Sequence, residues 1–131
     1  MATQNTFTIV GGLTADPEIR FNTNGKAMAT FTIASSERSF DRERNEWVEK
    51  STLYMRCVLW GKAAENVAET LRKGTRVIAT GTLVASSYTD RDGNKRTATE
   101  MRVEEVGPSL LFNTYKATET GAPRQYDAPP A

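Results

Sequence analysis

The structured-looking runs of this chain mostly follow a period of two, and this feature argues against a helical fold. Apolar and polar residues alternate in residues 7–12 and 29–34, and residues 53–60, 75–88 and 96–106 are the other predicted strands. A period of two places apolar side chains on one face of an extended strand and polar ones on the other. The dipeptides Asn24-Gly25 and Asp92-Gly93 favour tight turns between neighbouring runs. We therefore predict an all-β chain with five strands over these residues.

One segment breaks the period and predicts a single helix between the third and fourth strands. Its apolar residues recur at i, i+3, i+4 and i+7, and they are Ala64, Val67, Ala68 and Leu71. Arg72 and Lys73 are expected in the last turn, where cations favour the helix dipole, and Gly74 is expected to end the helix. Three strands, one helix and two further strands are typical of the five-stranded Greek-key barrel called the oligonucleotide-binding (OB) fold.

Three stretches lie outside this pattern. Residues 37–50 are dense in both charges, and we expect a long exposed loop or a flexible hairpin tip there. The apolar run at residues 110–115 predicts one extra strand near the C-terminus. Glycine and prolines mark residues 117–131 as a disordered tail that follows an OB-fold domain at residues 1–116.

The composition disfavours most catalytic chemistry. The 131 residues include no histidine and one cysteine, which excludes Ser-His and Cys-His nucleophiles, the usual zinc sites and an intrachain disulfide. Glu104 and Glu105 are adjacent on a predicted strand, so their side chains point to opposite faces rather than forming an acid-base pair. The sequence has no phosphate-cradling glycine loop. We therefore predict no enzyme activity, no catalytic residues, no metal and no cofactor.

The chain also lacks the sequence marks of a membrane or secreted protein. No run reaches the roughly eighteen apolar residues of a membrane span, and residues 1–8 have neither a basic nor an apolar signal region. Since there is only one cysteine, the reducing cytoplasm is the expected compartment. The net charge of +1 is uninformative, because a nucleic-acid binder needs a local basic track rather than a basic total.

The most unusual face belongs to the third predicted strand. One face of this strand carries Tyr54, Arg56, Val58 and Trp60. The opposite face is a core or subunit-interface stripe made of Leu53, Met55, Cys57 and Leu59. Two large rings beside an arginine are compatible with a cross-strand aromatic pair or a second apolar interface. They are equally compatible with a platform for unpaired bases, on which each stacked base contributes about 1–3 kcal/mol.

Further aromatic residues lie where no apolar core is expected. Phe40 and Trp47 belong to the charged stretch, among Arg38, Arg42 and Arg44, and Tyr88 ends the fourth predicted strand. A charged run alone is typical of a solvated loop. Rings interleaved with cations instead fit a single-strand groove, in which cations contact phosphates and rings contact bases. The combination favours nucleic-acid binding.

The one cysteine has two interpretations. Cys57 lies on the inward face of its predicted strand, where a small packing residue is expected. The alternative is an intermolecular disulfide across a subunit contact.

Four separated motifs resemble bacterial single-stranded DNA-binding proteins. They are GLTADPEIRF at residues 12–21, WGKAAE at residues 60–65, LRKG at residues 71–74 and GTL at residues 81–83. The resemblance covers about residues 5–115, and the motifs occur in the order that the family has. The segment after Gly107-Pro108 is similar to actinobacterial members, in which an extra strand near the C-terminus reinforces the dimer.

The resemblance implies site residues, a partner and an assembly. The base-stacking aromatics of the family fall on Phe40, Tyr54, Trp60 and Tyr88, and Trp47 is a further candidate from the charged stretch. The phosphate contacts of the family correspond to Arg56, Lys62, Arg72 and Lys73. Capping of the helix is an alternative role for Arg72 and Lys73, and it is compatible with phosphate binding. Members of the family are homotetramers, so the resemblance implies four barrels with single-stranded DNA wrapped across them, acting in replication, recombination and repair.

Two departures from the family change what we expect. In many relatives the fourth strand carries basic residues at positions where this chain has Val84 and Ser86. Each lost phosphate contact removes about 0.7 from the slope of log affinity against log salt, so we expect weaker and less salt-sensitive binding. This sequence also ends without the acidic tip with which family members recruit replication and repair proteins. A shortened chain and a specialised paralogue are the two explanations. We therefore do not expect this chain to recruit those partners.

One alternative function stays open at this point. An OB-fold module that binds RNA or protein partners, as primosomal relatives do, would share the same fold. Aromatic stacking does not exclude RNA, because every base has a π-face.

Overall fold

The computed structural model describes residues 4–117, which form six strands and one helix. In chain order the elements are β1 (Thr6–Leu13), β2 (Glu18–Phe21), β3 (Ala27–Asp41), β4 (Glu46–Trp60), α1 (Lys62–Thr70), β5 (Arg76–Thr89) and β6 (Lys95–Pro108). Within the described range, no helix is long and apolar enough to cross a membrane.

Five of the strands close into a barrel. The sheet order is β1-β5-β6-β4-β3-β2, and β1 closes the ring by pairing with β3 at Gly12 and Leu13. β2 pairs only with β3, so it extends the sheet beside the ring rather than forming part of it. The helix lies between the third and fourth barrel strands, which is the Greek-key arrangement of the OB fold. The predicted fold class is therefore confirmed.

Two glycines allow strands to cross closely where the barrel bends. A Cβ atom built on Gly11 would lie 2.3 Å from the carbonyl oxygen of Ala34. A Cβ atom on Gly81 would lie 2.0 Å from the carbonyl oxygen of Arg102, and the register of β5 against β6 shifts between Thr80 and Gly81. Barrel corners need a residue without a side chain at such close approaches, and bulges bend the strand there.

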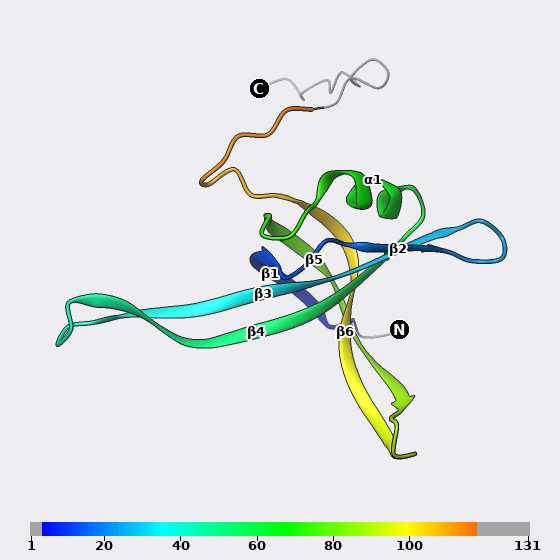
Figure 1. Cartoon of the computed structure of the whole chain (residues 1–131), viewed down its shortest axis with the longest axis horizontal. Coiled ribbons are helices and arrows are strands. Elements are labelled where there is room, and N and C mark those ends of the chain that lie inside the picture. The colour runs from blue at the N-terminus through cyan, green and yellow to red at the C-terminus, as the bar shows by residue number, and fades with distance from the viewer. Residues whose placement is uncertain (1–3, 118–131) are drawn as a thin grey trace.

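The core fills the barrel with one apolar face from each strand, and α1 covers one end of it (Figure 1). Its largest fully buried side chains are Ile33, Met101, Val77 and Cys57. The helix contributes Ala64 and Val67, and it packs against β3, β2 and β4. Full burial of a side chain of this size stabilises the fold by about 1.5–3 kcal/mol relative to exposure.

The end of the helix differs from the prediction. The helix stops at Thr70, because Leu71 already has extended dihedral angles (φ −88°, ψ 144°) while remaining buried in the core. Arg72 therefore lies beyond the last turn, yet its guanidinium donates hydrogen bonds to the carbonyl oxygens of Ala68 (2.7 Å) and Leu71 (2.8 Å). Gly74 has a φ of +86° and turns the chain toward β5 instead of ending the helix. The predicted interaction between a cation and the helix C-terminus is present, but it comes from outside the helix.

The charged stretch is a β-hairpin and not a loop. β3 and β4 stay paired as far as Asp41 and Glu46, so residues 37–50 form a long arm that leaves the barrel (Figure 1). β5 and β6 form a second arm that points in another direction (Figure 1). Of the two predicted alternatives for this stretch, the hairpin is therefore the correct one.

The predicted extra strand at residues 110–115 is wrong, since the sheet ends before it. Pro108 is the last residue of β6, and the next backbone hydrogen bond, from Ser109 to the carbonyl of Arg76, reaches the first residue of β5. No residue of β5 remains opposite the segment that follows, so residues 110–115 have no strand to pair with among the described residues. The sixth strand of the molecule is instead β2, which the sequence did not predict. The predicted tail beyond residue 117 lies outside the described residues.

Cys57 is fully buried, as expected of a packing residue, and burial raises the pKa of its thiol from 9.0 to about 12. We expect no disulfide-linked dimer on non-reducing electrophoresis after mild oxidation, and no alkylation of the native protein at pH 8, because only the thiolate reacts. The folded protein holds this proton more tightly than the unfolded chain does. The resulting contribution to the free energy of unfolding is therefore fully present below pH 9 and is lost as the pH rises toward about 12. Rapid alkylation of the native protein would show that the buried position is wrong.

Candidate nucleic-acid interface

The outward side chains of four neighbouring strands form one continuous surface, which we call the front face, at residues 28–40 of β3, 47–60 of β4, 96–102 of β6 and 82–88 of β5. Alternate residues of each strand contribute to it, because the strands pair in register. One row across the sheet reads Thr32, Arg56, Glu100 and Val84. The next row reads Thr30, Val58, Arg102 and Thr82. The front face thus contains the whole predicted aromatic and basic face of the third barrel strand.

The centre of the front face is hollowed. A depression of about 300 Å³ is lined by Met28, Thr30, Arg56, Val58, Trp60, Glu100 and Arg102. A smaller depression continues from Thr30 and Arg56 to the loop at residues 14–16 and to Glu18. Val58 is buried at the floor while the charged residues stand at the rim, so the hollow is apolar at its base and polar at its edge.

Trp60 lines this hollow and Tyr54 lies further along the same face of β4, and both rings are largely free. Trp60 is 46% exposed and Tyr54 is 66% exposed, so neither ring serves the core. Leu53, which belongs to the stripe expected to face the core or a subunit contact, is also exposed, because the strand has begun to leave the barrel at that point. Free aromatic rings beside a cation are what base stacking requires.

A cation that the sequence did not single out stands over Trp60. The Nζ atom of Lys26 lies 5.7 Å from the centre of the Trp60 ring, and the backbone of Lys26 is held by the side chain of Asn22 (2.8 Å). Lys62, a predicted phosphate contact, is exposed at the first position of α1, two residues after Trp60. Lys26 could not be assigned to the site from the sequence. β2 was not predicted, so the turn after β2 that contains Lys26 could not be placed beside β4.

The arm formed by β3 and β4 carries Phe40 and Trp47 near its tip. The two residues are paired across the strands, and their rings meet edge-to-face with centres 5.6 Å apart. Counted along a regular strand, Trp47 and Tyr54 would point to opposite faces, because they are seven residues apart. A β-bulge leaves Lys50 without a partner, so Trp47 returns to the face of Tyr54.

Polar side chains on the same face span this bulge. Ser36 donates to the carboxylate of Glu49 (3.0 Å), and Thr52 donates to the same carboxylate oxygen. These hydrogen bonds, the one from Thr52 first, hold the pKa of Glu49 below its ordinary value. These hydrogen bonds therefore stabilise the bulge on the face of the arm that carries the aromatic rings.

The second arm presents Tyr88 on the front face. Tyr88 is exposed and is paired with Arg96 across the hairpin. Asp90 accepts a hydrogen bond from the Nε atom of Arg96 (2.8 Å) and others from the backbone of Asn94 and Asp92. The bond from Arg96 is the main reason that the pKa of Asp90 is lowered. The turn therefore holds Arg96, a cation absent from the predicted set, in a fixed place beside Tyr88.

The remaining predicted cations lie at the edge of the front face or away from it. The backbone N–H of Lys73 donates to Asp16 (2.8 Å), which lines the smaller depression, so Lys73 borders that end. Two hydrogen bonds to the end of α1 already occupy one Nη atom of Arg72, which supports the alternative role in capping the helix. Val84 and Ser86 do lie on the front face, so the departure from basic residues falls within the candidate site.

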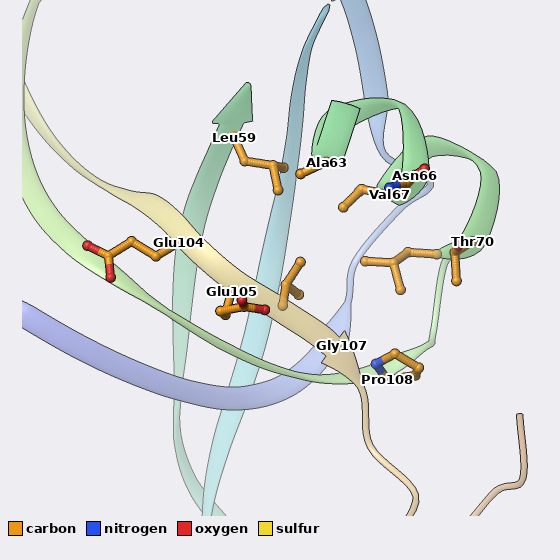
Figure 2. Close-up of a pocket in the computed structure, with 11 residues that line it drawn as sticks. Leu59, Ala63, Asn66, Val67, Thr70, Glu104, Glu105, Gly107 and Pro108 are labelled. Atoms are coloured by element: carbon orange, nitrogen blue, oxygen red, sulfur yellow. The ribbon is translucent and has the colours of Figure 1, made fainter. Parts of the chain in front are cut away.

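Another hollow of about 300 Å³ lies between α1 and the end of β6 (Figure 2). Apolar side chains such as Leu59 and Val67 line it, and Glu104 and Glu105 are its charged residues. A site with two carboxylates and no cation does not suit a polyanion. Among residues 4–117, no group of three or more His, Cys, Asp or Glu could hold a metal ion.

Comparison with known proteins gives the family of this chain. Residues 4–109 match the model of the single-strand binding protein family. A single-stranded DNA-binding protein of Paenarthrobacter aurescens is 52% identical over 120 residues, which cover 92% of this chain and 70% of the relative. Single-stranded DNA-binding protein 2 of Streptomyces coelicolor is 50% identical over 120 residues, which cover 92% of this chain and 60% of the relative.

A solved structure extends the comparison to the fold. The crystal structure of a small single-stranded DNA-binding protein from Streptomyces coelicolor matches with a TM-score of 0.72 at 25% identity. The match covers 83% of this chain and 97% of that chain. On the family model and the two relatives together, the chain belongs to the single-strand binding protein family.

Proposed function

We propose that this chain binds single-stranded DNA irrespective of its sequence and protects it during replication, recombination and repair. The observation that carries the proposal is the exposure of Trp60 and Tyr54 on one face, on either side of Arg56. Stacking on a ring is tolerant of sequence, and contacts with phosphates carry no sequence information. No catalytic role is part of the proposal, in keeping with a family of binding proteins.

The arms define the path that we propose for the strand. Trp60 and Tyr54 are six residues apart on β4, or about 20 Å at about 3.3 Å per residue. Phe40 and Trp47 continue this line along the first arm, and Tyr88 offers a ring on the second arm. The stretch from Trp60 to Trp47 is long enough for a site within the usual range of about 4–16 nucleotides per OB fold.

We propose that the cationic part of the site comprises Arg56, Lys62 and Lys73 from the sequence prediction, with a lesser part for Arg72. Lys26, Arg96 and Arg102 are added because they border the same rings and the same hollow. The neutral side chains of Val84 and Ser86 leave a gap in this track, so binding is expected to depend less on salt than in a typical relative.

The proposal includes a homotetramer in the cytoplasm. Large apolar side chains lie exposed away from the front face, on β1, β5 and the segment after β6, and these are Val10, Ile78, Leu110, Leu111 and Phe112. Exposed apolar groups of this extent are typical of a subunit contact. Light scattering measures the assembly directly, and a monomer at micromolar concentration would contradict it.

The proposed function is tested by following tryptophan fluorescence while poly(dT), an RNA of equal length and a duplex are added. We expect strong quenching with poly(dT) and little with the duplex, because Trp60 and Trp47 can stack only on unpaired bases. Repeating the titration at several salt concentrations gives the slope, which we expect to be shallower than that of a relative with basic residues at positions 84 and 86. Absence of quenching would favour a protein-binding barrel, and preference for RNA would favour the alternative nucleic acid.

A further inference from the structure

The barrel closes through a short seam between β4 and β6. Only three residue pairs join these parallel strands, from Arg56 with Glu100 to Val58 with Arg102. Beyond the pair of Arg56 and Glu100, the two arms separate in different directions (Figure 1). Each arm has aromatic residues on the front face, Phe40 and Trp47 on one and Tyr88 on the other. A strand of DNA that uses rings on both arms has to cross the front face at this pair.

The ion pair at this crossing is loose. The Nε atom of Arg56 lies 3.7 Å from the carboxylate of Glu100, beyond hydrogen-bonding distance, whereas the pair of Arg96 and Asp90 is joined at 2.8 Å. The Arg56 side chain is 59% exposed, while that of Glu100 is 22% exposed and lines the central hollow. Glu100 thus keeps a negative charge close to Arg56 without fixing the geometry of its guanidinium.

The groups around Arg56 and Glu100 do not fully neutralise the negative charge of the Glu100 carboxylate. Arg102 follows Glu100 on the same face of β6, Val84 faces it from β5, and Glu18 lines the smaller depression on the other side of Arg56. Carboxylates and phosphates bind the same planar fork of an arginine. Arg56 can therefore serve one of them fully at a time.

We propose that Glu100 is an internal competitor for the phosphate that Arg56 binds, so that DNA displaces this carboxylate when it occupies the centre of the front face. The inference rests on the proposed function and adds a residue that limits affinity at that site. It gives a second reason for shallow salt dependence, because the displaced carboxylate attracts a cation while the phosphate releases one.

The variant Glu100→Gln tests this, with Glu37→Gln as a control that removes the same charge from the opposite side of the sheet, where Glu37 shares the β3 side of Phe31 and Ile33. Binding of a fluorescent dT oligomer is measured by anisotropy at several salt concentrations. We expect Glu100→Gln to bind about three- to ten-fold more tightly at low salt, with a slope steeper by up to about 0.7. Glu37→Gln is expected to leave both quantities unchanged.

A double-mutant cycle separates competition at Arg56 from general repulsion. In an Arg56→Gln background, the gain from Glu100→Gln should disappear. A gain that persists would show that Glu100 repels DNA without acting through Arg56, and weaker binding by Glu100→Gln would show that Glu100 positions Arg56 for binding. Either result overturns the inference, as does unchanged affinity.

Two controls keep the outcome interpretable. Exposed ion pairs contribute little to stability, so Glu100→Gln should fold, and Glu100→Thr is a second neutral variant with a strand preference. If the unmodified chain fails to bind dT oligomers, the proposed function fails. If that chain binds and neither neutral variant binds more tightly than it does, only the inference about Glu100 fails.

Discussion

Replacing Trp60 with alanine is expected to weaken binding of single-stranded DNA by about 1–3 kcal/mol, or about 5- to 150-fold in Kd, because one stacked base is lost. The ring lies at the edge of the central hollow and is 46% exposed, so its removal deletes a stacking surface without opening the core. Anisotropy of a labelled dT oligomer gives the change in affinity. Urea unfolding should show a much smaller change in the free energy of unfolding.

Phe21 provides the matched control for Trp60. It is also an exposed aromatic residue, but on β2 it shares the side of Ile19, which packs against the core, and not the side that continues the front face. Phe21→Ala should therefore leave affinity unchanged, while Trp60→Phe should retain most of it because the ring is kept. Equal losses for Trp60→Ala and Phe21→Ala would show that the front face is not the binding surface.

Replacing Gly81 with alanine is expected to destabilise the fold by about 3 kcal/mol, at the upper end of what overpacking costs. The new Cβ atom would stand 2.0 Å from the carbonyl oxygen of Arg102 and 2.9 Å from the Cα atom of Val103. Both are backbone atoms, so neither can move aside as the end of a flexible side chain would. Urea unfolding measures the loss.

Gly107 is the control for this substitution. It lies on the same pair of strands, its φ is not positive, and a Cβ atom there would meet nothing within 4 Å. Gly107→Ala should therefore change the free energy of unfolding by less than about 0.5 kcal/mol. Similar effects at the two positions would mean that the close approach of β5 to β6 at Gly81 is wrong.

The barrel could be predicted from the sequence because its strands show their burial directly. Ala29, Phe31 and Ile33 alternate with half-buried residues, and the helix stripe breaks that period once. β2 could not be predicted, since it has four residues and only Ile19 among them packs against the core. Its position depends on pairing with β3, which is a property of the assembled sheet.

The candidate site was predictable within one strand and less so across strands. The rings of Tyr54 and Trp60 follow from the period of β4 alone. Lys26, Arg96 and Arg102 could not be assigned to the same surface, because strands far apart in sequence bring them there. The sequence could not decide between a loop and a hairpin at residues 37–50, because their exposed charged side chains pack against no core and therefore show no apolar alternation.

The unpaired residue in the arm also sets which changes of length the arm can tolerate. Loss of Lys50 would leave every cross-strand pair as it is and would turn the bulge into a regular ladder, with Phe40 and Trp47 still beside the path of Tyr54. Loss of one residue from β3 within the arm would instead turn the side chains between that residue and the tip to the opposite face of the arm. Arms of different reach can therefore arise from paired insertions or from gain and loss at the bulge, without loss of the aromatic track.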